Sequence, residues 1–152
     1  MAFSPNGQLF CSGGLEPQIR IREVKTRQVV RSVNHTSAVL SLAFSPNGKL
    51  LATGGFDCQI KLWDLATGKI VHTLEGHSDR ISTVIFSRDG QTIISSSWDG
   101  TIKLWQLSTG KQLANAVHSD RINTMALASD EGMLISGSED RTIKLWRCCL
   151  RG

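Results

Sequence analysis

Apolar and polar residues alternate over short stretches along the whole chain, and turn-forming residues separate these stretches. The alternation is clear over residues 80–86, 92–97, 101–105 and 111–116, where it predicts four successive β-strands. In each connection between these strands a glycine follows an aspartate or a threonine, which is typical of tight turns. No stretch has the period of an amphipathic helix, so the pattern predicts an all-β chain.

The four-strand pattern repeats every 41 or 42 residues. The string Thr-Ile-Lys-Leu-Trp occupies residues 101–105 and again residues 142–146, and related strings occupy residues 59–63 and 18–22. A period near 40 residues is typical of propellers built from four-stranded antiparallel blades. We therefore expect one repeat domain over residues 1–152, with four blades at approximately residues 1–34, 35–75, 76–116 and 117–152.

Counting the strands of these repeats gives fifteen rather than sixteen. The first repeat begins directly in what would be the innermost strand of its blade. After Trp146 the fourth repeat has only residues 147–152, which are too few for a turn and a fourth strand. The pattern therefore predicts that one blade lacks its outer strand and that no upstream segment supplies it.

The composition is that of a folded domain rather than a disordered one. Of the 152 residues, 40% are hydrophobic and 20% are charged. No apolar run approaches the roughly 18 residues that a membrane helix needs, and residues 1–7 lack the basic and apolar segments of a signal peptide. We therefore expect a cytoplasmic protein that makes no membrane contact.

The four cysteines have no spacing that is typical of a zinc site. Cys11 lies in an apolar strand and is expected in the core. Cys148 and Cys149 lie near the chain end, where exposed thiols could oxidise. No metal site is expected, and nothing in this pattern requires an oxidising compartment.

The net charge of +4 is concentrated in part of the first repeat. Five basic residues fall in one short stretch there, namely Arg20, Arg22, Lys25, Arg27 and Arg31. One interpretation is a surface for nucleic acid or an acidic partner. The favoured interpretation is a solvated outer edge of a blade, because charge on an exposed strand prevents unwanted pairing.

Four positions recur at fixed spacing in three of the repeats. A histidine precedes an aspartate by 22 residues, a serine or threonine lies between them, and a tryptophan follows the aspartate by 6 residues. The three sets are His35, Thr53, Asp57 and Trp63; His77, Ser95, Asp99 and Trp105; and His118, Ser136, Asp140 and Trp146. The first repeat departs from this pattern, with Glu16 and Arg22 at the aspartate and tryptophan positions.

At these residues the chain resembles the WD-repeat β-propeller family, over essentially its whole length. The resemblance implies that each set forms a structural hydrogen-bond network within its blade, in which the histidine bridges the aspartate and the hydroxyl, and the hydroxyl reaches the tryptophan N–H. Only Gly76-His77 keeps the family's Gly-His pair, and only Trp63-Asp64 keeps the Trp-Asp pair. The near-identical repeats resemble WD-repeat arrays of bacterial multidomain proteins.

Serine, histidine and aspartate together also suggest a hydrolase triad. Such a triad needs an exposed nucleophile and an oxyanion hole, whereas here the serine lies inside an alternating strand and the set recurs in each repeat. The chain has no Gly-x-Ser-x-Gly motif and no phosphate-binding loop before a helix. We therefore expect no enzymatic activity, no catalytic residues and no cofactor.

The resemblance implies instead that protein or peptide partners bind on the narrower face of the ring. The family's contact positions map to Leu15, Phe56, Trp98, Glu139, Ala38, Leu40, Arg80, Ser82, Arg121 and Asn123. The expected partner-binding residues among them are Phe56, Arg80, Trp98, Arg121, Asn123 and Glu139. Trp98 has an alternative interpretation, in which it packs on a neighbouring blade. If it binds, the expected ligand is a peptide with an apolar anchor and an acidic or phosphorylated group.

Rings of this family usually close with about seven blades, and an open array of four would leave blade faces and a strand edge uncovered. Three completions are therefore open. Two chains pair into one ring, a different protein completes the ring, or the chain is a fragment of a larger, for example signalling, protein. Closure of four such blades alone would be strained.

Overall fold

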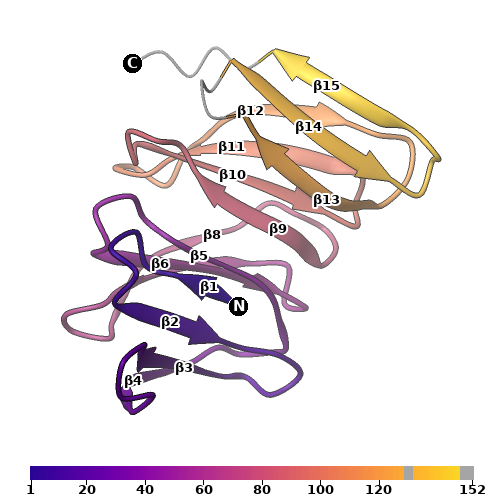
Figure 1. The fold of residues 1–152 in the computed structure, drawn as a ribbon. Helices are drawn as coiled ribbons and strands as arrows, with labels where there is room; N and C mark the ends of the chain where they lie inside the picture. The colour runs from indigo at the N-terminus through magenta and orange to yellow at the C-terminus, as the bar shows by residue number, and fades with distance from the viewer. Residues whose placement is uncertain (129–131, 148–152) are drawn as a thin grey trace.

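The computed structural model describes residues 1–128 and 132–147, in which fifteen strands form four antiparallel sheets (Figure 1). These residues contain no helix, and the sheets follow one another in chain order. The prediction of an all-β chain made of antiparallel sheets of three or four strands is therefore confirmed. The sheets do not close into a ring (Figure 1). Cys148 and Cys149, whose oxidation we considered, lie outside the described residues.

Each sheet consists of strands that are consecutive in the chain. Sheet 1 contains β1 (Ala2–Phe3), β2 (Leu9–Ser12), β3 (Gln18–Glu23) and β4 (Val29–Asn34). Sheet 2 contains β5 (Val39–Phe44), β6 (Leu50–Gly55), β7 (Ile60–Asp64) and β8 (Ile70–Leu74). Sheet 3 contains β9 (Ile81–Phe86), β10 (Thr92–Ser97), β11 (Thr101–Gln106) and β12 (Gln112–Val117). Sheet 4 contains β13 (Ile122–Leu127), β14 (Met133–Ser138) and β15 (Ile143–Arg147).

The first hairpin turn of sheets 1 to 3 has the same construction in each sheet. Gly7, Gly48 and Gly90 adopt φ values of 68°, 69° and 70°, a left-handed conformation that favours glycine. In sheet 2 the hydroxyl of Ser45 accepts the amide N–H of Leu50 at 2.9 Å and so holds the two ends of the turn together. These turns set the register in which neighbouring strands pair. The register decides which side chains lie together on each face of the sheet.

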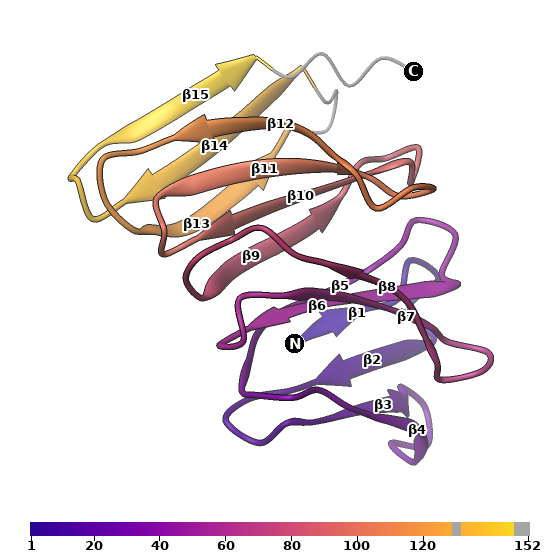
Figure 2. The same ribbon diagram turned by 180° about the vertical axis from the view of Figure 1, so that it is seen from behind.

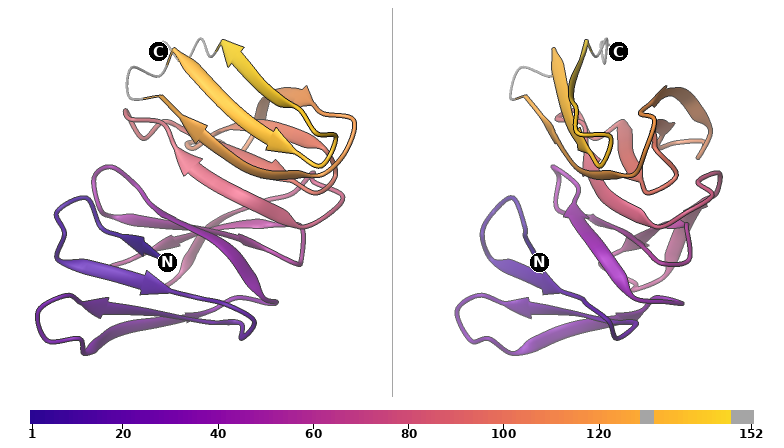
Figure 3. Two further views of the ribbon diagram at one scale, coloured as in Figure 1. Left: turned by 45° about the vertical axis from the view of Figure 1, so that its right-hand side comes forward. Right: turned by 90° about the vertical axis from the view of Figure 1, so that its right-hand side faces the viewer.

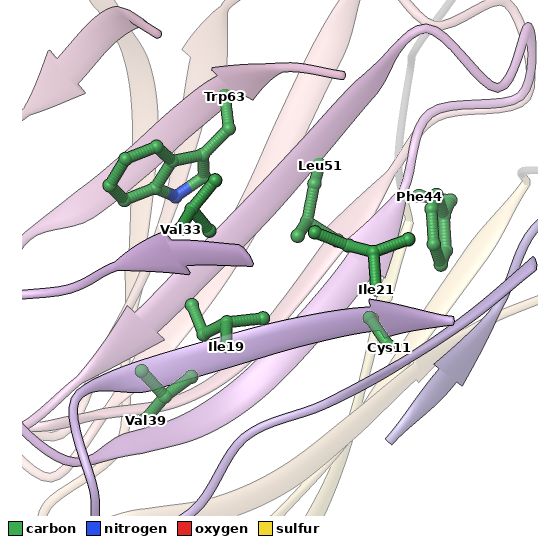
Figure 4. Packing of buried hydrophobic residues seen from close by; sticks show 8 residues of the cluster. All are labelled: Cys11, Ile19, Ile21, Val33, Val39, Phe44, Leu51 and Trp63. Carbon is green, nitrogen blue, oxygen red and sulfur yellow. The ribbon is translucent and has the colours of Figure 1, made fainter. Parts of the chain in front are cut away.

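The hydrophobic core lies between successive sheets rather than within one sheet. We call the side of a sheet that packs against the next sheet its forward face, and the opposite side its backward face. Between sheets 1 and 2 the forward-face side chains meet the backward-face side chains in a single cluster (Figure 4). Its buried members are Cys11, Ile19, Ile21, Val33, Val39, Phe44, Leu51 and Trp63. Burial raises the pKa of the Cys11 thiol to about 11, so this cysteine is a neutral core residue, as expected.

Two further clusters of the same kind join sheets 2 and 3 and sheets 3 and 4. The first strands of successive sheets lie beside one another, and sheets 1 and 4 lie at opposite ends of the array (Figures 2 and 3). Within the described residues, the backward face of sheet 1 and the forward face of sheet 4 therefore have no neighbouring sheet.

Candidate functional site

Sheet 3 contains a chain of hydrogen bonds that joins β10 and β11 to the segment before β9 and to the turn between β10 and β11. Trp105 Nε1–H donates to Ser95 Oγ at 2.8 Å, and Ser95 Oγ lies 2.8 Å from His77 Nε2. His77 Nδ1 lies 2.9 Å from Asp99 Oδ2. Because the carboxylate only accepts, one neutral tautomer satisfies every bond, with the proton on Nδ1 and the Ser95 hydroxyl donating to Nε2. His77 lies before β9 and Asp99 lies in the turn between β10 and β11, so the network holds these two segments together at one end of the sheet.

Sheet 4 repeats this arrangement. His118 lies 2.9 Å from Asp140 and 2.7 Å from Ser136, and Trp146 Nε1–H donates to Ser136 Oγ at 2.8 Å. In both sheets the hydrogen bonds stabilise the ionised aspartate and hold its pKa well below the usual range. For Asp140 the Thr142 hydroxyl has the largest effect on the pKa.

Burial by itself would raise the pKa of Asp99. The hydrogen bonds from His77 and the Thr101 hydroxyl outweigh that effect and lower the pKa. Both aspartates are therefore ionised acceptors that orient the histidine ring at neutral pH.

Sheet 2 departs from the expected network. Trp63 Nε1–H still donates to Thr53 Oγ1 at 2.9 Å, but the Thr53 hydroxyl donates to the Lys61 carbonyl oxygen at 3.4 Å. His35 Nε2 is buried and has no hydrogen-bond partner. The expected bridge from His35 to Thr53 is therefore absent.

The cause lies at the carboxylate of Asp57, which is occupied by other donors. Its Oδ2 accepts hydrogen bonds from the ammonium group of Lys61 and the hydroxyl of Thr36, and His35 Nδ1 lies 3.4 Å away. Burial raises the pKa of Asp57, but Lys61 and Thr36 lower it by a larger amount. Burial, together with the positive charge of Lys61, lowers the pKa of His35, so its imidazole is neutral.

Lys61 is a member of this site that the repeat pattern did not indicate. A lysine occupies the same position in sheets 3 and 4, but Lys103 bonds to Gln112 and Lys144 to the Val117 carbonyl oxygen. Two differences in the sequence could have indicated the change: Thr36 stands where sheets 3 and 4 have a serine, and Gln59 stands where they have a threonine that bonds to the aspartate.

Sheet 1 lacks the network, as its sequence indicates. Glu16 is exposed and pairs with Arg20 at 3.9 Å. Arg22 occupies the tryptophan position and donates to the Arg27 carbonyl oxygen at 3.3 Å.

The serine, histidine and aspartate sets do not present a nucleophile to solvent. Ser95 and Ser136 are 0% and 1% exposed, and each hydroxyl is bonded to both a histidine and a tryptophan. A substrate carbonyl could not approach either oxygen without unfolding the sheet. Across residues 1–128 and 132–147, no cluster of three or more His, Cys, Asp or Glu side chains could hold a metal ion, and no helix is long and apolar enough to cross a membrane.

A second constellation lies at the turns of sheets 2, 3 and 4, and we call it the arginine–aromatic row: Phe56, Arg80, Trp98 and Arg121. The guanidinium carbon of Arg80 lies 3.9 Å from the ring centroid of Phe56 and 4.8 Å from that of Trp98. The guanidinium carbon of Arg121 lies 4.9 Å from the Trp98 ring centroid. The row therefore alternates ring and cation across three sheets, and each contact is within cation–π range.

Backbone hydrogen bonds position the members of this row at one end of the sheets. The Trp98 N–H donates to the Arg80 carbonyl oxygen at 2.9 Å, so these neighbours in the row come from one sheet. The Phe56 N–H donates to Ala38 at 3.0 Å, and the Glu139 N–H donates to Arg121 at 2.9 Å. The same bond therefore recurs in three sheets and brings the predicted contact positions to one side of the array.

Trp98 has the inter-sheet contact that one of its two interpretations predicts. It packs against the guanidinium group of Arg121 from sheet 4, and it keeps part of its surface in solvent. Asn123 and Glu139 are exposed, and their side chains form no ring contact with the row. Among the described residues, neither Arg80 nor Arg121 forms an ion pair with a carboxylate.

The basic stretch of the first repeat is partly used within the protein. Arg31 Nη2–H donates to the Ala66 carbonyl oxygen of sheet 2 at 2.7 Å, and Arg20 bonds to Gln18 at 2.8 Å. Lys25 and Arg27 are exposed. The side chains that donate within the protein have fewer donors left for phosphate groups, which weakens the nucleic-acid interpretation.

Comparison with known protein families matches residues 27–64, 68–106 and 110–147 to the family described as WD domain, G-beta repeat. The matched stretches together cover more than half of the chain. Each contains the outer strand of one sheet and the first three strands of the next. No curated protein matches the chain.

Proposed function

Because the chain belongs to the WD-repeat family, we propose that it is a non-catalytic scaffold that binds a protein or peptide partner through the arginine–aromatic row. WD repeats are generally protein-interaction modules without enzymatic activity. The observation that supports this site is the pair of guanidinium groups that are stacked on aromatic rings and lack a carboxylate partner among the described residues.

Stacking leaves a guanidinium group well prepared to bind an anion. The guanidinium carbon of Arg80 lies over the rings of both Phe56 and Trp98, and the N–H donors of a guanidinium group lie in its own plane. A side chain that is already ordered loses less entropy when it binds, so these donors favour a carboxylate or phosphate group. The partly exposed Trp98 offers an apolar surface beside them. The proposed ligand is therefore a peptide segment with an acidic or phosphorylated residue next to an apolar one.

The test uses an array of synthetic peptides in which a leucine or phenylalanine is flanked by aspartate, glutamate or phosphoserine. Peptides that bind are then titrated, with fluorescent labels, against Trp98→Ala and Arg121→Gln. We expect Trp98→Ala to weaken binding by about thirty-fold, the effect of losing an interface hot spot. Arg121→Gln should weaken binding of acidic peptides by about ten-fold and leave neutral peptides unaffected.

The matched control is Arg27→Gln, which removes an exposed arginine outside the row and should leave binding unchanged. Equal affinity of Trp98→Ala and the unaltered chain for every bound peptide would reject the row as the binding site. Binding of an unrelated oligonucleotide that falls steeply with salt and is lost when Arg20, Arg22 and Lys25 are neutralised would instead favour the nucleic-acid alternative.

A further inference from the structure

The pentapeptide Thr-Ile-Lys-Leu-Trp has two different environments in this chain. In β11 the isoleucine Ile102 is 0% exposed, because sheet 4 covers the forward face of sheet 3. In β15 the equivalent Ile143 is 71% exposed. The sequence is the same, but the neighbours of the two isoleucines differ: Ile102 is covered by sheet 4 and paired with Ala116 of β12, whereas Ile143 has no covering sheet and, within the described residues, no outer strand beside it.

Other apolar side chains on the forward face of sheet 4 are also more exposed than their equivalents in a covered sheet. Ile135 and Leu145 are paired across β14 and β15 and are 42% and 64% exposed. Their equivalents in sheet 2, Ala52 and Leu62, have the same pairing and are fully buried against sheet 3. Contiguous apolar side chains of this size on a sheet face are typical of an interaction surface.

A glycine on this face leaves room for an incoming side chain. In sheet 2 an added Cβ at Gly54 would lie only 2.5 Å from Ile81 Cγ2, so the side chain of sheet 3 uses the space that the glycine leaves. Gly137 is the equivalent glycine of sheet 4, and an added Cβ there would meet only Thr124 of its own sheet, at 3.6 Å. The forward face of sheet 4 thus has the same hollow, without the side chain that fills it.

The backward face of sheet 1 is the other face that has no neighbouring sheet among the described residues. Phe3 is 68% exposed and contacts the Phe10 ring at a centroid distance of 6.0 Å. Their equivalents in sheet 2, Phe44 and Leu51, are both buried against sheet 1. Arg22 stands at the tryptophan position, where its aliphatic stem can cover apolar surface while its charged end reaches solvent.

We propose that the forward face of sheet 4 binds the backward face of sheet 1 of a second copy of this chain. Every interface inside the chain joins a forward face to a backward face, and the two uncovered faces are one of each kind. The contact is therefore head to tail, and two copies have two such contacts available to close one ring. The second copy continues an interface that the chain already builds between its own sheets.

The experiment measures the absolute mass of the purified chain by light scattering after size exclusion, over a hundred-fold range of concentration. We expect a mass of two copies, twice 16.6 kDa, at the higher concentrations. Ile143→Asp and Phe3→Asp should each shift the mass to a single copy, because each places a charge on one half of the contact. Both residues are exposed in one copy, so circular dichroism should show unchanged strand content. Leu113→Asp, on the exposed strand β12, is the matched control and should keep the mass of two copies.

Mixing the two variants tests the direction of the contact. A mixture of Ile143→Asp and Phe3→Asp chains retains one unaltered forward face and one unaltered backward face, so we expect the mass of two copies to return. A single copy at every concentration of the unaltered chain would overturn the proposal. So would loss of association in Ile143→Asp but not in Phe3→Asp, because that result means two forward faces pair with each other. Trp98→Ala should keep the mass of two copies, so failure of peptide binding and failure of association give different results.

Discussion

Strands β11 and β15 share the residues Ile-Lys-Leu-Trp but differ in their neighbours: β11 pairs with β12 and is covered by sheet 4, whereas β15 is the last strand of its sheet within the described residues and has no covering sheet. Their tryptophans, Trp105 and Trp146, both donate to a serine on the neighbouring strand at 2.8 Å. Their isoleucines are 0% and 71% exposed. The hydrogen bond of the tryptophan is thus made within the sheet itself, whereas the burial of the forward-face isoleucine depends on the neighbouring elements, above all the sheet that follows. The sequence of a repeat determines on which face of its sheet a side chain lies. Whether a forward-face side chain is buried depends on the sheet that follows.

The largest difference in the free energy of unfolding is expected between the variants Ile102→Ala and Ile143→Ala. Ile102→Ala should lower the free energy of unfolding by about 3 kcal/mol, because it leaves a cavity in the core between sheets 3 and 4. Ile143→Ala, measured at a concentration too low for association, should change it by less than about 0.5 kcal/mol. Urea denaturation of both variants gives the two values, and similar losses would contradict the comparison.

The serines of the two networks should behave alike, in contrast to the isoleucines. Ser95→Ala and Ser136→Ala each remove the hydroxyl that joins a histidine to a tryptophan. Each should therefore lower the free energy of unfolding by about 2 kcal/mol, because buried nitrogen atoms lose their partners. The same urea experiment provides the check. A loss for Ser136→Ala near zero would mean that sheet 4 is not folded as sheet 3 is.

A smaller effect, on the pH dependence of the free energy of unfolding, should distinguish sheet 2 from sheets 3 and 4. The pKa of His35 is lowered in the folded chain, first by burial, so the folded state favours the neutral imidazole. Its contribution to stability is complete above the unfolded pKa near 6.5 and decreases as the pH falls below that value. We expect the loss of stability between pH 7 and pH 5 to be smaller in His35→Gln than in the unaltered chain. An equal loss in both would show that another group titrates in this range.

The carboxylates of Asp99 and Asp140 affect the stability of the protein at a lower pH than His35 does. The folded pKa of Asp99 and Asp140 lies below the ordinary value of 3.8, so their stabilisation is complete above that value and is lost only as the pH falls further. Asp99→Asn should therefore flatten the decrease in stability below pH 4.

The strands could be predicted closely because their positions depend on local alternation and turn chemistry. In sheet 3 the predicted strand 92–97 has the observed bounds, and the other three differ by one residue at one or both ends. The hydrogen bonds of His77 and His118 are those that the family resemblance implied, since the same residues recur at the same spacing.

Features that depend on several neighbours could not be predicted in this way. Lys61 bonds to Asp57 and Thr36 although the same lysine in sheets 3 and 4 bonds elsewhere, and sheet 2 differs from these sheets at both Thr36 and Gln59. The sequence placed Phe56, Arg80, Trp98 and Arg121 on one face, but their alternating order arises from the way adjacent sheets approach each other. The uncovered forward face of sheet 4 carries the same pattern as the covered ones, so only the assembled structure distinguishes them.

The most direct test is the dependence of unfolding on protein concentration. If a second copy covers the forward face of sheet 4, the urea midpoint of the unaltered chain should rise with concentration, because association stabilises the folded state by mass action. The cost of Ile143→Ala should then grow from under about 0.5 kcal/mol toward the roughly 3 kcal/mol of Ile102→Ala. A midpoint that is independent of concentration, with Ile143→Ala neutral throughout, would contradict the account.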